Sequence, residues 1–220
     1  MIRTDQLVYR YASGPDILFP DVDLPQGATL LLKGLSGAGK STWLALAAGL
    51  LRPTGGRITV AGQELNALKN MATDAWRART IGFLPQKLHL SEALSVAGNL
   101  AMAQWAAGVP DDPASVRRVL DTLGLAELAQ RKPRQLSGGQ AQRAALARAV
   151  LLNPRVILAD EPTASLDDDA AHAALALLQD CAKRCGATLV VATHDSRATN
   201  AFPSAFVCQI GTLPSWDMHS

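Results

Sequence analysis

Residues 34–41 of this 220-residue chain read Gly-Leu-Ser-Gly-Ala-Gly-Lys-Ser. They match the pattern G-x-x-x-x-G-K-[ST] in full. They also stand between a predicted strand at 27–33 and a predicted helix after Gly39, which is the context that this pattern requires. Glycines allow a tight turn whose backbone N–H groups point at phosphate oxygens, and the start of a helix adds a partial positive charge. Lys40 can reach the β- and γ-phosphates, and the Ser41 hydroxyl can bind Mg²⁺. The stretch therefore predicts a phosphate-binding loop.

An acidic pair, Asp160 and Glu161, ends the apolar run at 156–159. This run and a similar one at 188–191 are continuous rather than alternating, which is typical of parallel strands buried on both faces. Ligands bind at the carboxyl ends of such strands, so Asp160 is suited to hold Mg²⁺ and Glu161 to polarise an attacking water. Two adjacent acids at a strand end are common by chance, so this interpretation depends on the phosphate loop elsewhere in the chain.

The remaining pattern predicts a succession of strands and helices. Strands are expected at 3–11, 57–61 and 81–85, and an Ala- and Leu-rich helix at 168–184. The pattern is helical throughout from 88 to 152, with breaks where Gly and Pro interrupt it at 108–110 and 132–133. The order is a β-rich start, a strand–loop–helix unit, a helical insert and a final β-α-β unit.

A second glycine motif, Leu136-Ser137-Gly138-Gly139-Gln140, lies at the start of the last helix of this insert. Ser137 followed three residues later by Gln140 is a capping box, which is a sufficient structural reason for both residues. Tandem glycines are poor helix formers that capping does not require, and a Ser-Gly-Gly helix start can also bind an anion. The two interpretations are compatible, because a cap organises the same backbone N–H groups.

The phosphate loop, this second motif and the acidic pair, in this order, resemble the nucleotide-binding subunit of an ATP-binding cassette (ABC) transporter over almost the whole chain. The resemblance implies an α/β fold. Its P-loop NTPase (RecA-like) core carries an N-terminal antiparallel β subdomain and an inserted α-helical subdomain. It also implies one ABC ATPase domain over 1–220. Residues 1–86 and 153–220 would form the nucleotide-binding core, and 87–152 the helical signature subdomain.

Further positions of the family pattern can be matched in this sequence. Gln86 ends the strand before the insert, Ser165-Leu166-Asp167 follows the acidic pair, and His194 follows the run at 188–191. Tyr11 is similar to the aromatic residue that stacks on adenine, with Tyr9 as the alternative. Without the family context, Gln86 could be a polar strand end, Asp167 a helix N-cap, His194 a structural histidine and Tyr11 a core residue.

The resemblance implies ATP and Mg²⁺ as cofactors and assigns the site residues as follows. The expected nucleotide-binding residues are Tyr11, Gly34, Leu35, Ser36, Gly37, Ala38, Gly39, Lys40, Ser41, Thr42, Ser137, Gly138, Gly139, Gln140 and Asp167. The expected metal-binding residues are Ser41, Gln86 and Asp160. The expected catalytic residues are Glu161, His194, Lys40 and Gln86.

In this family the second glycine motif of one subunit faces the phosphate loop of another. The resemblance therefore implies a dimer, with a homodimer expected. Ser137, Gly138 and Gly139 would contact the γ-phosphate of ATP held by the partner, and hydrolysis would release the dimer. The chain would power a separate transmembrane permease, and it would lie at the cytoplasmic face of the inner membrane through that permease.

Within the family, the approach to Gln86 and the position of Asn99 are similar to the lipoprotein-releasing, macrolide-export and cell-division ATPases. Two alternative functions remain open. One is a cell-division type ATPase that acts on a membrane partner without transport, and the other is a cytosolic ABC ATPase of translation or DNA repair. The second usually needs two cassettes or a long coiled coil, and this chain has one cassette and no sustained heptads.

The charge of the chain argues against nucleic acid as a partner. There are 21 Lys and Arg against 19 Asp and Glu, a formal net charge of +2, and no long basic run. The longest apolar stretch of the N-terminal half is far short of a membrane span, so membrane contact is expected only through the permease.

A surface for that permease is expected near Gln86 and the start of the insert. Most of its apolar residues should be core, and a few should stay exposed as a groove for a helix of the partner. The candidates are Leu88, Leu90, Leu94, Val96, Leu100, Met102 and Trp105.

Overall fold

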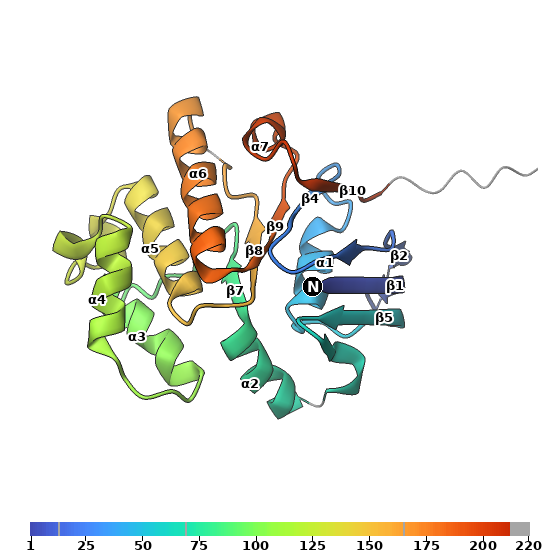
Figure 1. Ribbon diagram of the computed structural model, residues 1–220, viewed down its shortest axis with the longest axis horizontal. Helices are drawn as coiled ribbons and strands as arrows, with labels where there is room; N and C mark the ends of the chain where they lie inside the picture. The colour runs from blue at the N-terminus through green and yellow to red at the C-terminus, as the bar shows by residue number, and fades with distance from the viewer. Residues whose placement is uncertain (13, 69, 165, 212–220) are drawn as a thin grey trace, which may run out of the picture.

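The computed structural model describes the chain apart from residues 13, 69, 165 and 212–220. A parallel sheet runs through its centre. Figure 1 shows α5 and α6 on one side of this sheet, and α1 with an antiparallel sheet on the other. The strands of the parallel sheet are, in spatial order, β10 (Phe206–Gln209), β4 (Thr29–Lys33), β9 (Thr188–Ala192), β8 (Val156–Asp160) and β7 (Ile81–Leu84).

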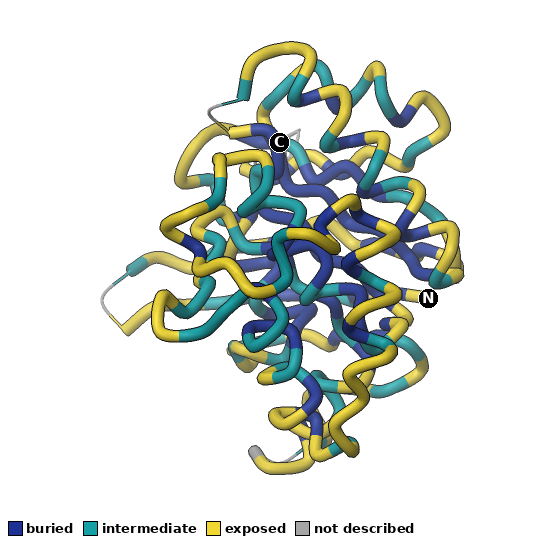
Figure 2. Tube along the Cα trace, turned by 90° about the vertical axis from the view of Figure 1, so that its left-hand side faces the viewer, coloured by how far each residue is buried: buried dark blue, intermediate teal, exposed yellow. Residues whose placement is uncertain are grey.

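The central strands are buried on both faces, as their continuous apolar runs predict. In β8, Ile157 and Ala159 belong to the core on the α6 side, and Val156 and Leu158 to the core on the α1 side. The same alternation divides β4 and β9 between the two cores. Figure 2 shows these buried segments running through the middle of the molecule. A polar side chain can therefore reach solvent only at the ends of these strands.

The antiparallel sheet contains the N-terminus. Its strands are β1 (Ile2–Arg10), β2 (Asp16–Leu18), β3 (Asp23–Leu24), β5 (Gly55–Val60) and β6 (Gln63–Glu64). The predicted strands at 3–11 and 57–61 are β1 and β5, whereas the shorter strands were not expected. Between the two sheets lies α1 (Lys40–Ala47), whose Trp43, Leu44 and Leu46 are fully buried. This packing fixes the helix that begins at the phosphate loop.

The insert contains α3 (Val96–Ala106), α4 (Pro113–Thr122) and α5 (Gly138–Val150), which we call the helical lobe. The expectation of helix from residue 88 is wrong for 88–95, because α3 begins only at Val96, after the Ser95 side chain caps it through Gly98 N. The break at 108–110 is confirmed, and Gly108 has a φ of 62° there. A short 3₁₀ helix at Pro133–Gln135 marks the second break.

The other helices are α2 (Asn70–Thr80), α6 (Asp168–Cys185) and α7 (Ser196–Ala201). The predicted helix at 168–184 is α6. It begins at the N-cap Asp167 and ends at Gly186, which adopts the left-handed conformation with a φ of 60°. The α2 helix was missed because polar residues fill most of its length. None of the described helices is long and apolar enough to cross a membrane.

Asn99 on α3 organises the segment that follows the predicted Gln86 site. Its side chain is fully buried, accepts a hydrogen bond from Ser91 N at 2.7 Å and donates to Ser91 O at 3.1 Å and to Ser95 O at 3.0 Å. Half-buried backbone groups need partners, and this one amide supplies several of them. The Asn99 side chain therefore ties both ends of the loop 91–95 to α3.

The Asn99→Ala variant should lose about 1–3 kcal/mol in free energy of unfolding, because it leaves the half-buried Ser91 N–H without its partner. Urea denaturation followed by circular dichroism measures the loss. Asn200→Ala, at an exposed position on α7, is the matched control and should stay within about 0.5 kcal/mol of the wild type. A loss in Asn99→Ala no larger than in this control would contradict the role of the amide.

Candidate nucleotide-binding and catalytic site

The phosphate loop joins β4 to α1, in the position that the sequence predicts. Glycine is required at Gly34, because a Cβ there would lie 2.6 Å from the Ile210 carbonyl oxygen. Gly39 is the N-cap of α1 and has a φ of 103°, which other residues rarely adopt. The exposed part of the loop is formed by Leu35, Ser36 and Gly37. The loop therefore offers open backbone at the start of a helix whose other end is anchored in the core.

Lys40 is buried and its ammonium group is held by several acceptors. It donates to Gly34 O at 2.9 Å and to Leu35 O at 3.2 Å, and its Nζ lies 3.3 Å from Glu161 Oε1. The Lys40 and Glu161 side chains are only 6% and 11% exposed. A charge with so little water around it must be neutralised by its neighbours, so the loop and the acidic residue share this cation.

Asp160 ends β8 beside the start of α1, where the Ser41 hydroxyl donates a hydrogen bond to it. Burial raises the pKa of the Asp160 carboxyl above its ordinary value, against the opposing effect of the Ser41 hydrogen bond. A carboxylate and a hydroxyl are the hard oxygen ligands that Mg²⁺ prefers. The donor set of Ser41 and Asp160 therefore fits this ion.

Glu161 follows β8 with a φ of 47°, the left-handed region that is unfavourable for a residue with a side chain. Its backbone N–H donates to Ala192 O at 2.8 Å, which holds the turn against the end of β9. Residues kept in such conformations are concentrated at functional sites, where the surrounding structure holds them. Here the turn directs the carboxylate toward Lys40 and away from the path of the strand.

Two residues after β9 complete the surroundings of this carboxylate. Thr193 Oγ1 donates to Glu161 Oε2 at 3.1 Å, and His194 Nδ1 lies 2.9 Å from Glu161 Oε1. Burial by itself would raise the pKa of Glu161, but the hydrogen bonds from His194 and Lys40 together hold it below its ordinary value. Glu161 is thereby kept as a carboxylate.

Thr193 was not among the residues predicted from the sequence. It is fully buried, and its hydroxyl also accepts a hydrogen bond from Asp195 N at 3.0 Å. A threonine next to a histidine carries no signal of its own in a sequence. Only its position opposite Glu161, across neighbouring strands, reveals the contact.

Tyr11 lies at the edge of the site. Its hydroxyl is 2.9 Å from Thr42 Oγ1 on α1, and the residue is 48% exposed, so it is not the core residue of the alternative interpretation. Tyr9 packs edge-on against it with ring centroids 4.8 Å apart. Tyr11 thus offers an open aromatic surface beside the phosphate loop, with Tyr9 behind it.

Gln86 and Asp167 stand on separate elements around this centre. Gln86 is exposed and follows β7, the strand paired with β8 through Leu84 and Ala159. Asp167 accepts a hydrogen bond from Ala170 N at 2.8 Å and caps α6, as the alternative interpretation expects. Ser165, the other polar residue of the predicted motif, lies outside the described residues.

The second glycine motif begins α5, and its capping box is present. Gln140 N donates to Ser137 Oγ at 3.3 Å, and Ser137 N donates to Gln140 Oε1 at 2.9 Å. Ser137, Gly138 and Gly139 are exposed, and no atom lies within 4 Å of a Cβ built on either glycine. Figure 1 shows the start of α5 in the helical lobe, on the other side of α6 from α1. One chain therefore brings together Lys40 and the two acids but keeps this motif apart from them.

Comparisons with known proteins agree with this geometry. A family model described as ABC transporter matches residues 20–164. The chain is 43% identical to the lipoprotein-releasing system ATP-binding protein LolD of Anaeromyxobacter dehalogenans over 85% of this chain and 81% of that protein. It is 39% identical to the methionine import ATP-binding protein MetN of Desulfitobacterium hafniense over 90% of this chain but only 59% of that protein. Among solved structures, the dimeric post-hydrolysis state of the ATP-binding cassette MJ0796 bound to ADP and Pi has a TM-score of 0.83 at 27% identity. That alignment covers 96% of this chain and 97% of the other.

The site also predicts a dependence of stability on pH. Hydrogen bonds from Arg197, and then from Thr163, hold the pKa of Asp195 well below its ordinary range despite partial burial. A carboxyl group with a lowered pKa in the folded chain contributes stability above its ordinary pKa and loses it as the pH falls toward the lowered value. Asp195→Asn should therefore be less stable than the wild type at pH 7, and the difference should shrink below about pH 4.

Urea midpoints of the wild type and the variant at a series of pH values measure this difference. Asp180→Asn, at an exposed position on α6, is the control and should follow the wild type throughout. A difference for Asp195→Asn that stays constant down to pH 3 would show that the ionised form of Asp195 is not what stabilises the fold.

Proposed function

This chain belongs to the ABC transporter family, and from that premise we propose how its residues carry out the work of such a protein. It is the ATP-binding and ATP-hydrolysing subunit of a transporter, and it works with a transmembrane permease. The two alternatives, a cell-division type ATPase and a cytosolic ABC ATPase, are not favoured, because the named relatives include subunits of lipoprotein-releasing and methionine import systems.

The observation that carries the proposal is the set of contacts around Glu161. A carboxylate held ionised between Lys40, Thr193 and His194 is suited to orient a water for attack on the γ-phosphate. In this proposal Glu161 polarises the water, and His194 holds the water and the γ-phosphate. Lys40 binds the β- and γ-phosphates. Nucleotide binding must then move Lys40 from its present acceptors to the phosphates, which releases Glu161 for catalysis.

The sites for Mg²⁺, for the phosphates and for adenine follow from the neighbouring residues. Ser41 and Asp160 would hold Mg²⁺, with Gln86 as a further contact from the end of β7, and the ion would neutralise phosphate charge. Residues 34–39 with Thr42 would surround the phosphates, and Tyr11 would stack on adenine. The exposed Tyr11 ring supports this choice over Tyr9, which lies behind it.

The position of the second glycine motif supports a site shared by two chains. Ser137, Gly138 and Gly139 are exposed and Gln140 is half-buried, but all lie far from α1 in the same chain. Anions bind at the N-termini of helices, and α5 presents one toward solvent. We propose that a second copy of this chain supplies the motif to the γ-phosphate, with Asp167 close by. Solved cassettes of similar fold are dimeric, which supports this arrangement.

A groove for the permease is proposed between α2, β7, α3 and α5. A cavity of about 390 Å³ lies there, lined by residues that include Arg77, Phe83, Ala103 and Arg148. Of the candidate patch residues, Val96 and Leu100 are buried, whereas Met102 is 40% and Trp105 81% exposed. Leu88, Leu90 and Leu94 are half-buried, and neither Met102 nor Trp105 lines the cavity itself. A helix of the permease would dock here, so the chain would lie at the cytoplasmic face of the inner membrane.

The two lobes would serve different purposes within one domain over 1–220. Residues 1–86 and 153–220 would bind and hydrolyse ATP. Residues 87–152 would carry the second glycine motif and respond to the permease. Several similar proteins are lipoprotein-releasing system ATP-binding proteins, from Anaeromyxobacter dehalogenans and Bacteroides fragilis among others, which supports a place in that subgroup.

The Glu161→Gln variant tests the proposal directly. ATP turnover should fall by about 10²- to 10⁴-fold, the contribution of a general base, while ATP affinity changes little. ATP should then hold the variant as a dimer, because the shared phosphate is not removed. Steady-state phosphate release and light scattering with ATP measure both effects, with Glu127→Gln in the helical lobe as the control. Wild-type turnover in Glu161→Gln would refute the assignment.

The Lys40→Ala variant should instead lose affinity for ATP. A charge-assisted contact contributes about 1.5–3 kcal/mol, so the dissociation constant should rise about 10- to 100-fold. Isothermal titration calorimetry measures this change. Lys183→Ala, an exposed position on α6, should bind ATP like the wild type. Undiminished binding by Lys40→Ala would rule out its phosphate role.

A further inference from the structure

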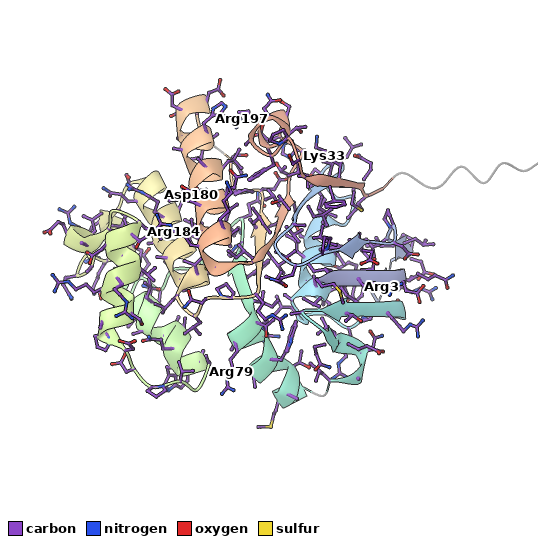
Figure 3. The ribbon with its side chains drawn as sticks, viewed as in Figure 1. Arg3, Lys33, Arg79, Asp180, Arg184 and Arg197 are labelled. Atoms are coloured by element: carbon purple, nitrogen blue, oxygen red, sulfur yellow. The ribbon has the colours of Figure 1, made fainter. Side chains whose placement is uncertain are left out.

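Arg197 on α7 connects the segment around His194 to residues 166–168, and these two segments have separate roles in the proposed site. It lies three residues after His194, and its guanidinium reaches the segment that follows the acidic pair. Nη1 donates to Leu166 O at 3.2 Å and to Asp168 Oδ1 at 2.8 Å. Figure 3 labels Arg197 beside α7 and the upper end of α6, where these segments meet.

The same guanidinium is fixed by Asp195 on its other side. Nη2 lies 2.7 Å from Asp195 Oδ2, and Nε donates to the same oxygen at 2.8 Å. Asp195 in turn accepts a hydrogen bond at 2.7 Å from Thr163 Oγ1, on a residue that is 2% exposed. The Asp195 carboxylate therefore fixes the position of the guanidinium that contacts residues 166–168.

The α7 helix is itself held to the core. Asp195 caps it through Arg197 N at 2.8 Å, and Thr199 accepts a hydrogen bond from Lys33 at the end of β4. Lys33 lies next to the phosphate loop, so α7 is tied to the strand that leads into the site. A displacement of residues 166–168 would be resisted by this helix through Arg197.

The chemistry of this junction needs arginine. Its planar group presents donors in fixed directions and can serve the Asp195 carboxylate, the Leu166 carbonyl and the Asp168 carboxylate together. A lysine ammonium is a point charge that cannot span these acceptors. Arginine at this position therefore fixes the relative positions of its three acceptors as well as neutralising the carboxylates.

We propose that Arg197 is a positioning residue for ATP hydrolysis. It keeps Asp167 and His194 at a fixed distance and orientation relative to each other. This inference rests on the proposed roles of Glu161, His194 and Asp167. Arg197 touches neither the phosphate loop nor Tyr11 in the described residues, so its loss should lower the rate of hydrolysis far more than the affinity for nucleotide.

The test compares kcat and KM for ATP in purified variants. Arg197→Met should lower kcat by about tenfold or more, within the range that a misplaced catalytic geometry produces, and leave KM within about twofold. Asp168→Ala should lower kcat severalfold, and Asp169→Ala, its neighbour in the first turn of α6, should not. Combining Asp168→Ala with Arg197→Met should lower kcat no further than Arg197→Met alone.

Three results would overturn the inference. The first is a double variant whose loss of kcat is the product of the losses in Arg197→Met and Asp168→Ala. The others are equal losses of kcat in Asp168→Ala and Asp169→Ala, and a rise in KM without a fall in kcat. Asp168 is 85% exposed, so the comparison with Asp169 stands even if Arg197→Met fails to fold. Glu161→Gln and His194→Ala are measured in parallel. If they keep wild-type turnover, the proposed function fails, whereas if only Arg197→Met keeps it, the inference alone fails.

Discussion

The buried contact between Lys40 and Glu161 sets the conditions for the rest of the site. Two opposite charges 3.3 Å apart with little access to water lose much hydration, and their attraction offsets this cost only when other partners complete the surroundings. The phosphate loop carbonyls, Thr193 and His194 provide those partners from two separate stretches of the chain. The contact requires β4, β8 and β9 to end at the same edge of the sheet, where α1 begins, so the packing of the core determines the geometry of the site.

The double burial of the parallel sheet explains where this edge can be. Each central strand divides its apolar residues between two cores, and only the strand ends are free for polar groups. The antiparallel sheet and α1 cover one face, and α5 and α6 cover the other (Figure 1). The helical lobe then carries the second glycine motif away from Lys40 of the same chain. The separation of this motif from Lys40 follows from the same arrangement of layers.

Prediction from the sequence succeeded where a pattern is local and failed where a contact is distant. The phosphate loop, the doubly buried strands, the Ser137 cap and the α6 helix were all predicted, because each depends on neighbours within a few residues. The segment 88–95 was expected to be helical because its leucines suggest a helix face. In the structure the side chain of Asn99 holds its last residues as a loop. Thr193 and Arg197 were missed because their partners lie about 30 residues away in the chain.

The sequence by itself determined the kind of chemistry, because glycines, a lysine and paired acids at fixed spacing have few uses other than binding a phosphate and a metal. Tertiary structure alone decided how these groups meet. It brought Lys40 against Glu161, turned Tyr11 rather than Tyr9 toward solvent, and connected the His194 segment to residues 166–168 through Arg197. The physical reason is that such contacts depend on which strand ends lie side by side. That order follows from burying apolar surface over the whole chain and leaves no mark in any short stretch of it.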